Sequence, residues 1–143
     1  MKPINVRGSC LCGAVRYEIE GPVGRPENCH CGMCRKAHGA AFSTNAVVPT
    51  EALRVIAGAQ MLAEYESSPH RRKCFCRRCG SQLFIRRLNR PELTVVTLGT
   101  LDDDPGVRPA RHVFVGSKAP WHEIDVPLPA FEVYPGDDGA AAG

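Results

Sequence analysis

The sequence has no long apolar segment and little excess charge. None of its apolar runs approaches the roughly 18 residues that a membrane-spanning helix needs. The first eight residues lack the apolar core of a signal peptide. A net charge of +3, an acidic C-terminal third and no alternation of basic with aromatic residues give little reason to expect nucleic acid. We therefore expect a cytoplasmic protein with no membrane partner, for which nucleic acid is disfavoured.

The chain also lacks an internal repeat and a linker long enough to separate two domains. Its 143 residues are enough to bury one hydrophobic core. Fourteen glycines and twelve prolines favour short elements joined by turns over a helical bundle. We expect one zinc-binding β domain over residues 1–136, followed by a frayed, small and acidic tail at 137–143.

Apolar and polar residues alternate in several short segments, which predicts strands. Residues 14–20 place Val15, Tyr17 and Ile19 on one face, and residues 92–98 resemble a buried strand. Other strands are expected at 41–48, 53–57, 61–66, 71–75, 83–87 and 112–115. Loops or turns are expected at 8–13, 21–26 and 102–106. The only helical turn expected is at 34–38, ended by Gly39. The predicted fold class is mainly β with little helix.

What the sequence does contain is eight cysteines in clusters. Because disulfides are rare in the cytosol, cysteines at ligand-like spacing indicate metal binding there. Cys10 and Cys12 form a C-x-C pair, and Cys76 and Cys79 form a C-x-x-C pair. The glycine that follows each pair, Gly13 or Gly80, lets backbone amides turn toward the sulfurs. Four thiolates complete a tetrahedron, so these two pairs predict a structural zinc site.

Three further cysteines, Cys29, Cys31 and Cys34, lie within six residues. Three protein ligands with one open position are typical of catalytic zinc. The alternative is a second structural zinc, completed by a fourth ligand: His30, His38 or Cys74. His30 would point away from the metal on an extended C-x-C segment.

An open three-thiolate site would have restricted chemistry. Three thiolates give a zinc unit a net charge of −1, so water bound there would be acidified less than at a neutral-imidazole site. A soft, electron-rich centre suits a sulfur ligand. We therefore expect the site to take up a substrate thiol and keep it as a thiolate nucleophile.

Residues outside the cysteine clusters are further candidates for function. Eight basic residues lie around the second cysteine pair: Arg71, Arg72, Lys73, Arg77, Arg78, Arg86, Arg87 and Arg90. They form either solvated strand edges or a patch for carboxylates or phosphates. Cys74 is interpreted as a small buried hydrophobe, with a spare or redox-active thiol as the alternative. Trp121 is interpreted as a core or rim aromatic. His112 and His122 are interpreted as structural.

Four segments together resemble one family, that of the glutathione-dependent formaldehyde-activating enzymes, which shares its domain with centromere protein V. They are residues 8–13, 29–36, 75–81 and 112–123. The resemblance implies a mostly antiparallel Mss4-like fold and two zinc ions per chain. It assigns Cys10, Cys12, Cys76 and Cys79 to the structural zinc, and Cys29, Cys31 and Cys34 to the catalytic zinc. The family joins glutathione and formaldehyde into S-hydroxymethylglutathione, formally a carbon–sulfur lyase reaction.

The sequence thus favours an enzyme that activates a small thiol, by resemblance glutathione, for addition to a carbonyl such as formaldehyde. The second hypothesis is a thiol carrier, or a zinc-stabilised interaction module without turnover.

Overall fold

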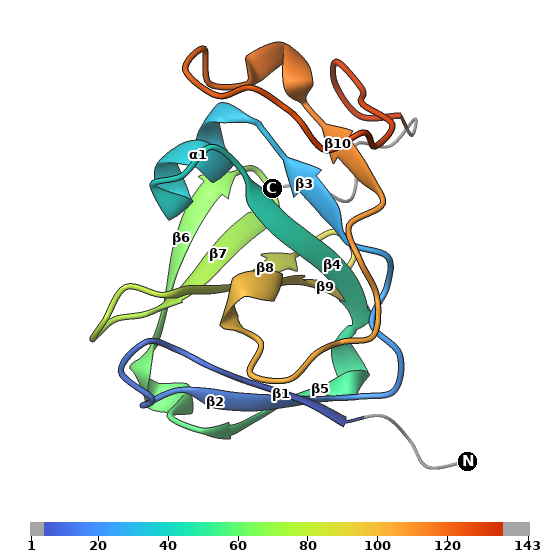
Figure 1. Cartoon of the computed structure of the whole chain (residues 1–143). Coiled ribbons are helices and arrows are strands. Elements are labelled where there is room, and N and C mark those ends of the chain that lie inside the picture. Colours follow the sequence, from blue (N-terminus) through green and yellow to red (C-terminus); the bar gives the residue numbers. More distant parts are fainter. Residues whose placement is uncertain (1–4, 136–143) are drawn as a thin grey trace.

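The computed structural model describes residues 5–135, which form two β-sheets and one short α-helix (Figure 1). The smaller sheet has the strand order β1 (Asn5–Ser9), β2 (Arg16–Glu20) and β5 (Leu53–Ala57). The larger sheet has the order β10-β3-β4-β9-β8-β7-β6. Its strands are β3 (Glu27–Cys29), β4 (Ser43–Pro49), β6 (Leu62–Ser68), β7 (Arg71–Cys76), β8 (Gln82–Arg87), β9 (Leu93–Thr97) and β10 (Arg111–Val113).

Helix α1 (Gly32–His38) begins after its N-cap Cys31 and ends at Gly39. Gly39 adopts the left-handed conformation, with φ 60°, as the sequence predicts for the residue that ends this helix. Single 3-10 turns lie at Thr50–Ala52, Ala59–Met61, Leu98–Thr100 and Val115–Ser117. The prediction of a mainly β fold with little helix is confirmed. Within residues 5–135, no helix has the length and apolar character needed to cross a membrane.

The main core lies between the two sheets. Val15, Tyr17 and Ile19 on and beside β2 are fully buried, as their alternation predicts. The Tyr17 ring packs edge-on against Phe84 of β8, with ring centroids 4.9 Å apart. A second, smaller cluster of buried residues contains Cys29, Cys34 and Val113. The three-thiol segment is therefore anchored in apolar packing of its own.

Two strands differ from the sequence expectation. Gly8 and Ser9, expected in a loop, belong to β1, which pairs antiparallel with β2. Cys29, which lies in none of the predicted strands, is on β3 between β4 and β10. Burial alternates along β1, but its two buried positions are Val6 and Gly8, so only one of them carries an apolar side chain that the sequence could show. β3 shows no alternation, because it is buried along its whole length and includes two polar residues, Glu27 and Asn28. The expected tail at 137–143 lies outside the described residues.

The larger sheet is antiparallel except where β10 pairs parallel with β3. A half-buried ion pair supports this junction, since the Arg111 guanidinium lies 2.8 Å from the buried Glu27 carboxylate. Arg111 also donates a hydrogen bond to the Tyr134 hydroxyl at 2.6 Å. This arrangement fixes β3, the strand that carries Cys29, against the C-terminal part of the chain at the top of Figure 1.

Candidate functional site

Four cysteine sulfurs from two distant segments of the chain lie close together. The ligand atoms of Cys10, Cys12, Cys76 and Cys79 all lie within 4.8 Å of one another. The Sγ atoms of Cys10 and Cys12 are 3.6 Å apart, and those of Cys12 and Cys76 are 3.9 Å apart. A tetrahedral zinc with Zn–S bonds of about 2.3 Å separates its sulfurs by about 3.8 Å. The donor set and its spacing therefore fit a closed zinc site.

The two glycines predicted to shape this group have left-handed backbones. Gly13 has φ 79° and donates to the Cys10 carbonyl at 3.0 Å, while Gly80 has φ 82° and donates to the Cys76 carbonyl at 2.7 Å. A hydrogen bond of 2.8 Å from the Leu11 N–H to the Ser81 hydroxyl joins the two turns. Hydrogen bonds from the side chain and backbone of Ser81 lower the pKa of Cys79 to about 5, which favours the thiolate.

The other three cysteines, Cys29, Cys31 and Cys34, converge at the N-terminal end of α1. Their sulfurs also lie within 4.8 Å of one another. Cys29 comes from the end of β3, Cys31 caps the helix and Cys34 lies in its first turn. As the helix cap, Cys31 Sγ accepts a hydrogen bond from the Cys34 N–H at 3.3 Å. One strand end and one helix turn thus present three soft donors to the same point.

The three thiols influence one another strongly. Hydrogen bonds with Cys29 and Cys34 lower the pKa of Cys31, and the charge of Lys73 contributes to this shift. The hydrogen bond with Cys31 raises the pKa of Cys29. The hydrogen bond with Cys34 and the burial of the side chain also raise it. Once one thiolate forms, its neighbours resist ionisation because like charges repel. A divalent cation would remove this repulsion, so the group fits a zinc ion with three thiolates.

The fourth-ligand candidates do not join these three sulfurs. Within residues 5–135, the group of mutually close ligand atoms contains neither His30, His38 nor Cys74. His38 lines a separate cavity with Phe42 and Ser43. Cys74 is buried on β7 and its thiol donates to Glu64 at 3.3 Å. Burial raises the pKa of Cys74 to about 12, which keeps its thiol protonated.

His30 points away from the thiols, into a cluster of aromatic rings. Its Nε2 lies 3.2 Å from Nδ1 of His112, and both side chains are buried. The His30 ring also packs against Phe42 at 5.0 Å and stacks with His122 at 6.0 Å. The sequence did not predict this cluster, because 82 residues separate His30 from His112 and no spacing rule connects them.

The hydrogen bonds indicate which ring nitrogens donate and which accept. His112 Nε2 lies 3.3 Å from the Val126 carbonyl, which can only accept, so Nε2 carries the proton. His112 Nδ1 is then an acceptor, and His30 Nε2–H donates to it. His30 Nδ1 is left as a buried acceptor without a partner. Burial and the nearby His112 lower the pKa of His30 to about 4, so this ring is neutral at pH 7.

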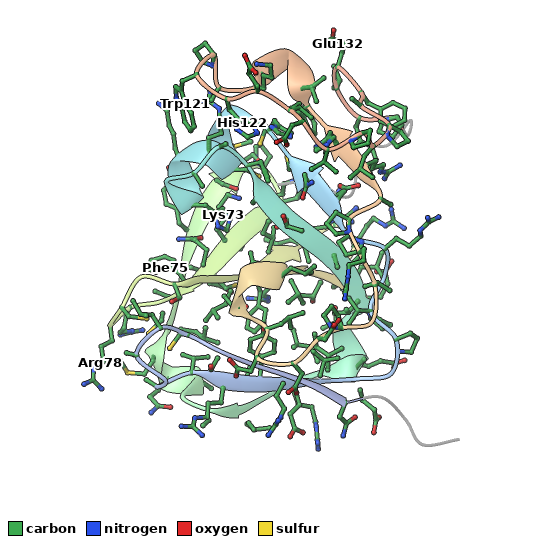
Figure 2. The ribbon with its side chains drawn as sticks, in the orientation of Figure 1. Lys73, Phe75, Arg78, Trp121, His122 and Glu132 are labelled. Carbon is green, nitrogen blue, oxygen red and sulfur yellow. The ribbon has the colours of Figure 1, made fainter. Side chains whose placement is uncertain are left out.

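Most residues of the basic stretch have a partner within the fold. Arg72 contacts Glu66 at 3.5 Å, Arg90 contacts Glu92 at 3.8 Å, and Arg86 is paired with Glu64. Arg71, Arg87 and Arg90 also have partners within the fold. Lys73 differs from these residues, since its side chain is buried and its ammonium has no hydrogen-bond partner. Figure 2 shows Lys73 and Phe75 along β7, with Arg78 farther down near the four-thiol group.

Trp121 occupies the rim, not the core. Its side chain is 70% exposed, and its ring lies 6.3 Å from that of His122. Both residues lie above α1 in Figure 2. Of the two positions expected for this tryptophan, the structure shows the rim position.

Comparison with known proteins agrees with this geometry. The family profile described as "Glutathione-dependent formaldehyde-activating enzyme" matches residues 5–117, which include all eight cysteines. A protein of Halomonas elongata named "Putative glutathione-dependent formaldehyde-activating enzyme" is 35% identical over 129 residues, covering 84% of this chain and 81% of that protein. Proteins of the same name from Aspergillus flavus and Aspergillus oryzae are each 38% identical over 79 residues, covering 54% of this chain and 41% of theirs.

A solved structure shares the fold. The crystal structure of a Rhodobacter sphaeroides protein matches with a TM-score of 0.58 and 30% sequence identity, covering 72% of this chain and 91% of that one. The resemblance implies an Mss4-like β fold. Both the sheets of this structure and the structural relative support that fold. From the extent of the profile match and the near full-length bacterial relative, this chain belongs to the glutathione-dependent formaldehyde-activating enzyme family.

Proposed function

We propose that the protein is a zinc-dependent enzyme that adds a thiol, by resemblance glutathione, to a carbonyl such as formaldehyde. The observation that carries the proposal is the group of Cys29, Cys31 and Cys34, three mutually close sulfurs without a fourth His, Cys, Asp or Glu ligand in the described chain. The reaction joins the thiol sulfur to the carbonyl carbon, and the thiol proton ends on the carbonyl oxygen. No oxidant or reductant is needed, and the reverse reaction is a carbon–sulfur lyase step.

Zinc held by these three cysteines would supply a soft Lewis acid that favours the thiolate form of an added thiol. The residues of the chain would hold the ion and set the reactivity of the site. Burial of Cys29 and Cys34 limits the access of water, and the N-cap hydrogen bond to Cys31 orients that sulfur. The His30–His112 hydrogen bond holds the segment between Cys29 and Cys31 against β10. The four-thiol group would hold a second zinc and stabilise the fold.

The proposed location is the cytosol, because clustered cysteines without disulfides are typical of a reducing compartment. A non-catalytic role as a thiol carrier or a zinc-stabilised interaction module is the second candidate. It is favoured by the same three-thiol group, which could take up a thiol without turnover. The two candidates differ in whether S-hydroxymethylglutathione forms faster in the presence of the protein than without it.

The test uses cobalt in place of zinc, because the visible spectrum of cobalt reports its sulfur ligands. With both groups loaded, added glutathione should intensify the sulfur-to-cobalt charge-transfer band as a fourth sulfur binds at the three-thiol group. Uptake should release a proton and strengthen as the pH rises toward the thiol pKa of roughly 8.5. A Cys31→Ser protein should lose the response. A wild-type spectrum that does not change with millimolar thiol would contradict the proposal.

A further inference from the structure

A cavity of about 480 Å³ lies between α1 and the β6–β7 hairpin. Met33 and Lys36, three residues apart on one face of α1, line one side, and Tyr65 and Phe75 line the other. This volume falls within the range of about 300–1,000 Å³ that is typical of small-molecule sites. Met33 lies in the chain between two of the three thiols, Cys31 and Cys34. Lys73, in the wall of this cavity, acts electrostatically on Cys31, so the cavity lies near the three-thiol group.

Lys73 provides a buried positive charge in the wall of this cavity. Its side chain is only 5% exposed, and Nζ has no hydrogen-bond partner. Of the eight basic residues in the surrounding stretch, Lys73 is the one that lines the cavity. A buried ammonium without a partner is unfavourable, and a bound anion would offset that cost. An anion that reaches Lys73 would occupy this cavity, and Figure 2 shows Lys73 below the helix α1.

Ser67 adds a second polar atom to the same cavity. Its Oγ is buried and also lacks a partner. The pairing of β6 with β7 shifts between Glu66 and Ser68, so Ser67 is the extra residue of a β-bulge. Bulges redirect side chains and often lie beside functional sites. The ammonium offers three donors and the hydroxyl offers one, which suits an acceptor-only group such as a carboxylate.

The remaining lining indicates what the carboxylate is attached to. Met33 is 43% exposed and Tyr65 is 65% exposed, so apolar side chains border the cavity where it meets solvent. The Gln82 amide lies in the lining and can bond to a peptide group. A short, flexible chain that ends in a carboxylate fits this combination of apolar rim and buried donors. A thiol that carries a carboxylate could reach the neighbouring three-thiol group from here.

We propose that Lys73 and Ser67 bind a carboxylate of the thiol substrate and so select carboxylate-bearing thiols. The proposal relies on the proposed function for the identity of the ligand as a substrate thiol. The anion site itself does not depend on the proposed function, because it follows from the cavity and its two unpaired polar atoms. The competing explanation is that Lys73 only balances the charge of the three thiolates. In that case, a carboxylate on the ligand would make no difference.

The test is calorimetric titration of the zinc-loaded protein with three probes. Glutathione carries both a thiol and carboxylates, S-methylglutathione carries the carboxylates without a free thiol, and glutathione diethyl ester carries the thiol without carboxylates. The variants are Lys73→Met, which removes the charge from an unbranched side chain of similar length, and Ser67→Ala. Arg54→Met is the matched control, because it removes one positive charge from an exposed side chain on β5 in the other sheet.

Wild-type protein should bind glutathione and S-methylglutathione on the order of tenfold more tightly than the diethyl ester, because hydrogen bonds to charged groups are the stronger kind. Lys73→Met should weaken binding of the two acids by a similar factor and leave the ester unchanged. Ser67→Ala should weaken the acids several-fold. Arg54→Met should stay within about twofold of wild type for all three probes.

Equal losses for the acids and the ester in Lys73→Met, or a loss of zinc alone, would overturn the proposal in favour of a countercharge. So would wild-type protein that binds glutathione no better than its ester. If Lys73→Met does not fold, the ester comparison in wild type and the Ser67→Ala protein decide. Carboxylate-dependent binding of S-methylglutathione with an unresponsive cobalt spectrum would refute the proposed function and leave the anion site standing.

Discussion

The imidazole rings of His30 and His112 share a buried hydrogen bond of 3.2 Å, although 82 residues separate them in the chain. His30 lies between two of the three clustered thiols, and His112 lies on β10. The bond therefore fastens the C-x-C segment to a strand near the other end of the described chain. A backbone hydrogen bond also joins these two segments, since the His30 N–H donates to the Val113 carbonyl at 3.0 Å.

Replacing His112 with phenylalanine should loosen this connection. His112→Phe keeps an aromatic ring but leaves His30 Nε2 without a partner, and it removes one of the two hydrogen bonds that the Val126 carbonyl accepts. We expect a loss of roughly 1–3 kcal/mol in unfolding free energy and faster loss of zinc to a chelator. Urea unfolding and a chelator time course would measure the two effects. His70→Asn, at an exposed left-handed turn position, is the control. Equal behaviour of the two variants would refute the structural role.

The two cysteine groups should respond differently to substitution. Wild-type protein should carry close to two zinc ions per chain, one for each group. Cys10→Ser or Cys76→Ser should impair folding, because structural zinc contributes on the order of 10 kcal/mol in small zinc domains. Cys31→Ser should fold, with weakened binding of one zinc and no thiol uptake. Elemental analysis and thermal melts give the readouts, and Cys74→Ala should retain both zinc ions. Identical melts for all three serine variants would remove the basis for separate structural and catalytic labels.

Gly8 should tolerate no side chain. A Cβ at this position would lie 2.1 Å from Cζ of Tyr17, the residue directly opposite on β2. Because Tyr17 is fully buried, the ring has no space into which to move. We expect Gly8→Ala to cost at least about 1–3 kcal/mol, the usual penalty for overpacking. Gly99→Ala is the control, since a Cβ there meets nothing within 4 Å. Urea midpoints that match for the two alanine variants would contradict the expectation.

Tyr17 should make the fold sensitive to alkaline pH. Burial raises its pKa to about 12, although the hydrogen bond with Thr100 acts in the opposite direction. In the unfolded chain the pKa is about 10, so between pH 10 and 12 the unfolded state releases the proton first. This contribution to stability is complete below pH 10 and is lost toward pH 12, at up to about 1.4 kcal/mol per pH unit.

Tyr17→Phe should abolish that slope. Below pH 10 the variant should be less stable by about 1 kcal/mol, because the 2.6 Å hydrogen bond to Thr100 is lost. Urea unfolding at pH 9, 10 and 11 would measure the change. Tyr65→Phe, at an exposed position on β6, should keep the wild-type slope. A slope retained in Tyr17→Phe would assign the alkaline sensitivity to another group.

Local patterns were enough to predict much of this protein. Cysteine spacing, with Gly13 and Gly80 behind each outer pair, predicted the two groups of sulfurs, because ligand spacing and backbone freedom are properties of a few adjacent residues. Alternation predicted the buried face of Val15, Tyr17 and Ile19 for the same reason. The family resemblance carried by these motifs agreed with the later comparisons.

Only the tertiary structure decided which distant residues meet. The parallel pairing of β10 with β3, the contact of His30 with His112, and the cavity that contains Lys73 and Ser67 all depend on how separate segments pack. In the sequence, Lys73 is one of eight similar cations. Burial against α1 distinguishes it, because a charge removed from water without a partner is costly wherever the fold leaves it unpaired. The cysteine motifs determined where a metal could bind, and the packing around them determined what could bind beside it.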